Sequence, residues 1–320
     1  MPSCGGVRRD NLPARSRVLE ECDESQEVRD EGDTSRVSIT LSSRDAFAAA
    51  LATGNDIALC AYTLAPGGTV VRALEVAGDR GARVAVRLAG RPTFGHGRAP
   101  GDATGLAAML RAHHVAVETE ATGAPPAHLK AAVIDNEAFL DDRNWATSGH
   151  ETIVRDDDAG DVAAVRAAIF GQRAPCADIA FEKEAALALE VATIRAAPGD
   201  RIDVATESFG GCEMSAALVS RARAGTHVRL EVTARALAAD ASGREHTVIA
   251  NLVAAGAEVR AVASDEKFAI AGETAWLGSA NATYSPGPMS DWGAVTRDPA
   301  IEADLATTFE DAWARGTPVA

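Results

Sequence analysis

Three residues in the stretch AHLKAAVIDNEAFLDDRNW, residues 127–145, have side chains that could handle phosphate. His128, Lys130 and Asp135 are two and five residues apart in an otherwise apolar run. An imidazole can be neutral near pH 7, so it can attack an electrophile or carry a proton. A lysine ammonium donates to oxygens whose negative charge grows in a transition state. The alternative is a buried strand whose histidine is bonded to a backbone carbonyl.

A second stretch, DEKFAIAGETAWLGSAN at residues 265–281, repeats this pattern in the same register. Lys130 and Asp141 are eleven residues apart, and so are Lys267 and Gly278. The agreement in spacing indicates that the two stretches are copies of one unit.

The second stretch differs from the first at its polar positions. Asp265 stands where the histidine would be, and Gly272 stands where the aspartate would be. The end of the second stretch, LGSAN, supplies Ser279 and Asn281, whereas the first stretch reads LDDRN and retains only Asn144. Together the two stretches therefore contain one imidazole.

The surrounding sequence indicates how the two stretches could be brought together. From residue 37 onward, short β-branched runs alternate with amphipathic, alanine-rich segments, which is typical of helices packed on a sheet. The two halves align segment by segment: 57–64 with 202–209, 70–88 with 214–232, and 105–120 with 248–263. A repeat of about 140 residues is too long for a solenoid unit and predicts two similar α/β domains about a pseudo-twofold axis.

Three parts of the chain follow from this alignment. Residues 1–36 are rich in charged and small residues and have no sustained period, so we expect a disordered or loosely ordered tail. The first domain is expected over 37–174 and the second over 175–320, with a linker near 171–181.

The paired motifs H-x-K-x4-D and G-S-x-N in a duplicated α/β chain resemble the phospholipase D superfamily of phosphodiesterases. The resemblance covers about residues 37–316 in architecture, and its specific part is the two motif stretches. It implies a duplicated fold of two α/β/α domains, each with a mixed central sheet. In that family one histidine attacks phosphorus to form a phosphohistidine, a second protonates the leaving oxygen, and no metal or other cofactor is needed.

The resemblance also assigns roles to residues of this chain. His128 would be the nucleophile, and Asp265 would stand in the place of the proton donor. A carboxyl group could donate if its surroundings kept it protonated; ionised, it would compete with phosphate for the lysines. The residues that would bind phosphate are Lys130, Asn144, Lys267, Ser279 and Asn281. The residues that would support the site are Asp135, Glu151 and Asp291.

Composition restricts the partners and the compartment. The net charge of −15 and the pI near 4.9 disfavour nucleic acid, because such binding rests on Lys and Arg neutralising phosphates. The five cysteines are dispersed without a C-x-x-C pair, so neither a zinc site nor a disulfide framework is indicated. No signal sequence or transmembrane segment is evident, and we expect a cytoplasmic protein that is compatible with a homodimer.

Two functions remain open at this point. The first is hydrolysis or transfer at a phosphodiester, in a phospholipid or a small molecule, through His128. The second is an inactive protein of the same fold that binds an anion, a lipid or a protein partner. A nuclease is the lesser enzymatic alternative because of the acidic charge.

Overall fold

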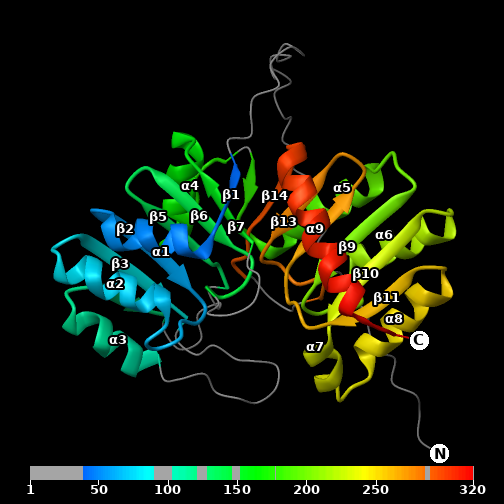
Figure 1. Cartoon of the computed structure of the whole chain (residues 1–320), viewed down its shortest axis with the longest axis horizontal. Coiled ribbons are helices and arrows are strands. Elements are labelled where there is room, and N and C mark those ends of the chain that lie inside the picture. Colours follow the sequence, from blue (N-terminus) through cyan, green and yellow to red (C-terminus); the bar gives the residue numbers. More distant parts are fainter. Residues whose placement is uncertain are drawn as a thin grey trace, which may run out of the picture. The chain divides into compact units, whose positions relative to one another are not determined.

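The computed structural model describes residues 39–89, 103–120, 128–145, 152–176, 178–284 and 289–319. The predicted tail, residues 1–36, and Glu151 lie outside the described residues. The described chain forms two mixed β-sheets with helices on their faces (Figure 1). Both sheets belong to a single compact unit.

The first sheet has seven strands, of which β2, β3 and β4 run parallel and the others pair antiparallel. Its order from edge to edge is β1 (Thr40–Ser42), β7 (Ile153–Asp156), β6 (Glu137–Asp141), β5 (Ala131–Ile134), β2 (Asp56–Ala61), β3 (Arg83–Leu88) and β4 (Ala116–Thr119).

The second sheet has the same order with one strand added. It runs β8 (Ile179–Ala180), β14 (Gly293–Thr296), β13 (Ala275–Gly278), β12 (Phe268–Ala271), β9 (Arg201–Thr206), β10 (His227–Thr233), β11 (Glu258–Val262) and β15 (Thr317–Pro318). Each strand of the first sheet has a counterpart, with parallel strands in the same places. The predicted duplicated α/β fold with mixed central sheets is confirmed.

The helices repeat in the same way. The first half contains α1 (Arg44–Thr53), α2 (Thr69–Asp79), α3 (Ala103–Ala112) and α4 (Ala159–Ile169). The second half contains α5 (Lys183–Ala196), α6 (Glu213–Arg223), α7 (Ala234–Ala239), α8 (Arg244–Ala254) and α9 (Pro299–Arg315). Helices α4 and α9 both begin after an aspartate, Asp158 or Asp298, whose carboxylate accepts backbone N–H groups of the first turn.

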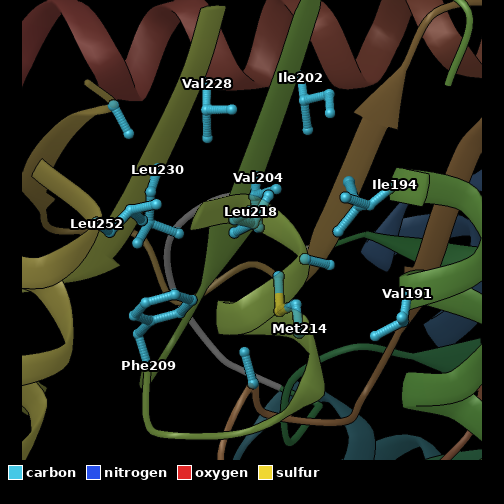
Figure 2. Close-up of a cluster of buried hydrophobic side chains, with 14 of the residues drawn as sticks. Val191, Ile194, Ile202, Val204, Phe209, Met214, Leu218, Val228, Leu230 and Leu252 are labelled. Carbon is cyan, nitrogen blue, oxygen red and sulfur yellow. The ribbon is translucent and has the colours of Figure 1, made fainter. Parts of the chain in front are cut away.

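Successive side chains along the central strands point to opposite faces of the sheet, so one strand contributes to two different hydrophobic cores. In β12, Phe268 and Ile270 face one cluster, while Ala269 and Ala271 face another. The first cluster joins the two halves, because it also contains residues of β5, α4 and α9. The second lies between the second sheet and α5, α6 and α8 (Figure 2). Burial on both faces of the sheets explains why these strands are almost continuously apolar.

The predicted boundary between residues 174 and 175 falls in the connection from α4 to β8. Strand β8 pairs with β14, so it already belongs to the second sheet. The boundary itself stays a prediction.

Candidate active site

The two motif stretches occupy equivalent places in the two sheets. His128 and Lys130 directly precede β5, whose first residue pairs with Cys60 near the end of β2. Asp265 and Lys267 precede β12 in the same way, beside the end of β9. Both stretches therefore lie at the carboxyl ends of parallel strands, where α/β proteins place their ligands.

Hydrogen bonds between the halves join the stretches directly. The indole Nε1 of Trp292 donates to the backbone oxygen of Asp141 at 2.8 Å. The backbone N–H of Lys267 donates to Oδ2 of Asp142 at 3.0 Å. The fold thus brings residues of both motifs into one cluster, as the duplication predicted.

His128 is held by a chain of two polar side chains from the second half. Its Nδ1 lies 2.6 Å from Oδ1 of Asp291, and the same oxygen accepts the hydroxyl of Ser279 at 2.8 Å. The Ser279 hydroxyl in turn accepts the backbone N–H of Trp292 at 3.1 Å. A proton on Nδ1 satisfies Asp291, which leaves Nε2 as the nitrogen with the lone pair.

Burial sets the charge of this histidine. The pKa of His128 is lowered, first by burial and then by the Lys130 ammonium, although Asp291 opposes both. Burial would raise the pKa of Asp291, but His128 and Lys130 hold it below its ordinary value. A neutral imidazole beside an ionised carboxylate is the state that a nucleophilic histidine requires.

Lys130 is the cation nearest to this imidazole. Its Nζ lies 2.8 Å from Nδ1 and 3.0 Å from Nε2 of His128. Within the described residues, no carboxylate oxygen forms an ion pair with it. Burial, with a contribution from Lys267, lowers its pKa to about 8. Lys130 can therefore donate to an anion that approaches His128.

Lys267, the counterpart in the second half, is surrounded by oxygens. Its Nζ donates to the backbone oxygens of Asp142 and Asp265, both at 3.1 Å, and lies 3.5 Å from Oε2 of Glu207. Burial would lower its pKa, but Glu207 and the neighbouring aspartates raise it above its ordinary value. The Lys267 ammonium is therefore engaged by two backbone oxygens and one carboxylate of the protein.

Asp265 does not reach the lysines with its side chain. Its Oδ1 lies 2.5 Å from Nε of Arg143, and its Oδ2 lies 3.5 Å from Nη2 of Arg235. If Asp265 were ionised, its carboxylate was expected to compete with phosphate for Lys130 and Lys267. The structure directs its carboxylate to two arginines instead.

The adjacent acids Asp141 and Asp142 also have partners inside the protein. Oδ2 of Asp141 accepts the backbone N–H of Trp145 at 2.6 Å, and both side chains are fully buried. Burial, then Glu266 and Asp141, raise the pKa of Asp142 well above its ordinary value. Oδ2 of Asp142 also accepts the backbone N–H of Lys267, so both acids are engaged inside the protein.

The remaining predicted residues differ in their positions. Ser279 is fully buried and donates to Asp291, so its hydroxyl hydrogen is not offered to a ligand. Asn281 donates to Oε2 of Glu207 at 3.4 Å. Asn144 is half-buried, and among the described residues its amide oxygen accepts no hydrogen bond.

Asp135 lies in the turn between β5 and β6. Its Oδ1 accepts the backbone N–H groups of Asn55 and Asp56 at 3.0 and 2.9 Å. This turn is at the opposite end of β5 from His128. Asp135 therefore supports the sheet and not the imidazole.

Sequence reasoning missed Glu207, Arg235 and the pairing of Arg143. A signal for Glu207 was present in the alignment of 57–64 with 202–209, which places it opposite Tyr62. Tyr62 contacts the His128 ring edge-on, with 4.9 Å between ring centroids. A carboxylate in the place of that ring marks a difference between the halves.

The described chain contains a cavity of about 940 Å³. Its lining includes the apolar side chains of Leu129, Phe181, Leu187 and Met214 and charged ones such as Lys183. Its described lining does not include His128 or Lys130.

No group of three or more His, Cys, Asp or Glu within the described residues could hold a metal ion. None of the described helices has the length and apolar character needed to cross a membrane.

A scan against protein-family models and a search of curated proteins found no match. Solved structures do resemble the fold. Phosphatidylserine synthase from Haemophilus influenzae Rd KW20 superposes with a TM-score of 0.61 at 8% identity, over 88% of this chain and 87% of that one. Polyphosphate kinase from Porphyromonas gingivalis superposes with a TM-score of 0.59 at 14% identity, over 85% of this chain.

The chain spans only 50% of the length of that polyphosphate kinase. Nuc from Salmonella typhimurium, described as a phospholipase D family member, matches 44% of this chain and 95% of its own length, with 18% identity and a TM-score of 0.39. The strand order of both halves and the two longer superpositions lead to one conclusion: the chain has the duplicated α/β fold of these two solved structures.

Proposed function

We propose that the chain acts on phosphodiesters, by hydrolysis or transfer through a phosphohistidine on His128. The observation that supports this most strongly is the chain of contacts from Ser279 through Asp291 to Nδ1 of His128. It leaves Nε2 as the nucleophilic atom and holds the ring in one orientation. A structural histidine would not need a buried, ionised carboxylate supported by a second side chain.

The chemistry would proceed in two steps. Nε2 of His128 attacks phosphorus while the bond from phosphorus to the leaving oxygen breaks, and Lys130 donates to the phosphoryl oxygens. Water or an acceptor hydroxyl then attacks the phosphohistidine, and the imidazole is restored. The carboxylate of Asp265 contacts Arg143 and Arg235, and we assign it no part in protonating the leaving oxygen. Leaving groups that are stable as anions are therefore favoured.

The substrate class we propose is a phospholipid head group or a small phosphodiester. The acidic charge of the chain disfavours nucleic acid, so nuclease action is the lesser alternative.

A chromogenic diester, bis-p-nitrophenyl phosphate, tests the proposal because its leaving group needs no proton. We expect His128→Ala to lower kcat by about 1000-fold or more, as the loss of a nucleophile does. His246→Ala is the matched control, since His246 is exposed and pairs with Asp240 on the surface. Equal rates for the unaltered chain and His128→Ala would contradict the nucleophile role.

A second function, binding without turnover, is favoured by one feature of the second half. Lys267 and Asn281 face Glu207, and Asp265 faces two arginines, so this half offers few free donors to a transition state. A chain that binds phosphate but turns over no diester, activated or natural, would support this second function and exclude the first.

A further inference from the structure

Three cationic or N–H donor groups of the second half converge on the carboxylate of Glu207. Lys267 Nζ lies 3.5 Å from Oε2, and Asn281 Nδ2 donates to the same oxygen at 3.4 Å. Arg235 Nη2 donates to Oε1 at 3.1 Å. An ammonium, an amide and a guanidinium around one oxyanion form a complete anion-binding arrangement. Its occupant is a side chain of the protein itself.

Charge shows how firmly this occupant is held. Burial would raise the pKa of Glu207, but Lys267, Lys130 and Arg235 lower it to about 2. The side chain remains 29% exposed, so the carboxylate lies at the border of the cluster and not deep in the core. Glu207 is therefore ionised at any physiological pH and neutralises one of the two buried lysines.

The first half has no such occupant. Tyr62 follows β2 as Glu207 follows β9, and it places an uncharged ring against His128. Lys130 forms no ion pair with a carboxylate among the described residues. Within the described residues, Lys267 is thus paired with a carboxylate, whereas Lys130 contacts the His128 ring.

We propose that Glu207 determines the charge of the ligand that this site accepts. With Glu207 in place, Lys267, Asn281 and Arg235 are engaged, and Lys130 remains the ammonium beside His128, where a singly charged phosphodiester would bind. A phosphate monoester or inorganic phosphate carries close to two negative charges near neutral pH, and it would need Lys267, Asn281 and Arg235 as well. Glu207 therefore excludes dianionic phosphates and favours diesters. This inference deepens the proposed function and rests on it for the identity of the site.

The test is the affinity for inorganic phosphate and for diethyl phosphate, measured by calorimetry near pH 7.5 and without turnover. We expect Glu207→Gln to tighten the binding of inorganic phosphate by on the order of tenfold and that of diethyl phosphate by much less. Glu273→Gln is the matched control, because Glu273 is exposed in the turn at the far end of β12 from Lys267. It removes the same charge and should change neither affinity.

The unaltered chain supplies a second measurement if Glu207→Gln does not fold. It should bind diethyl phosphate more tightly than inorganic phosphate. The reverse order would overturn the inference, and so would equal tightening of both anions by Glu207→Gln. Because neither measurement needs turnover, a chain without diesterase activity could still bear out the role of Glu207. If the chain has diesterase activity but Glu207→Gln does not change the relative affinity for the two anions, the role of Glu207 is rejected and the proposed function stands.

Discussion

The two halves of the molecule share one strand order but present opposite chemistry at the ends of equivalent strands. The first half places the ring of Tyr62 against His128, whose ring nitrogens contact the Lys130 ammonium. The second half places the carboxylates of Glu207 and Asp265 among cations. Duplication has therefore retained the scaffold on both sides while one side alone kept the imidazole. A fold of this kind tolerates the difference because the sheets and cores do not depend on the residues at the strand ends.

A turn remote from the site shows the opposite behaviour. Asp135 and Gly272 occupy the same position after β5 and β12, and both have positive φ, 52° and 68°. Aspartate and glycine are among the residues that tolerate this left-handed conformation. The residue type differs, but the backbone geometry is retained because the hairpin requires it. The two halves thus differ in the chemistry of their side chains at the strand ends, whereas at this turn both have a residue that tolerates positive φ.

The largest effect on this comparison is expected from Asp291→Asn, which removes the carboxylate that distinguishes the environment of His128. An amide cannot hold the proton on Nδ1 in the same way, so we expect kcat for a diester to fall by on the order of 1000-fold. Asp135→Asn is the matched control, because Asp135 accepts backbone N–H groups at the opposite end of β5 from His128. Rates that fall equally in both variants would show that Asp291 has no special role.

A change of pH is expected to have a smaller effect on activity. Lys130 should determine the alkaline limb of the pH profile, and Lys267 should not. Activity should rise as pH increases through the pKa of His128, which lies below 6.5, because the neutral ring is the nucleophile. It should fall, by about tenfold per pH unit, as Lys130 loses its proton above about pH 8. Lys130→Arg should remove this alkaline fall, since arginine stays charged.

Lys267→Arg is the control for the pH profile, because Glu207 and the neighbouring aspartates keep the pKa of Lys267 above its ordinary value. Its alkaline limb should match that of the unaltered chain. An alkaline limb that moves with Lys267 and not with Lys130 would reverse the assignment of the two halves.

The smallest effect is expected at the paired turns, where only stability should change. Asp135→Ala loses the acceptor for the N–H groups of Asn55 and Asp56, and Gly272→Ala places a β-carbon at φ 68°, 3.2 Å from Pro198 Cδ. We expect each to lower Tm by a few degrees in thermal unfolding followed by circular dichroism. Neither substitution should alter kcat. If Asp135→Ala is folded at the assay temperature but has lost activity, Asp135 belongs to the site.

Much of the architecture could be predicted from the sequence. The β-branched runs, the alanine-rich helices and the equal spacing from each lysine to the end of its motif predicted two similar α/β domains in register, and the family resemblance implied mixed sheets. His128 and Lys130 were candidates from their residue types and spacing, and Asp291 was a candidate from the resemblance. These features are local, because hydrophobic periodicity and covalent spacing act within one segment of chain.

The charge balance of the site was decided only by the tertiary structure. Glu207 and Lys267 are sixty residues apart in the chain, and Arg143 and Asp265 belong to different halves. Which carboxylate neutralises which cation depends on how strand ends from both sheets meet, and on burial that strengthens some pairs. The sequence by itself determined the scaffold and the candidate residue His128, whereas packing of the two halves determined which charged groups surround it.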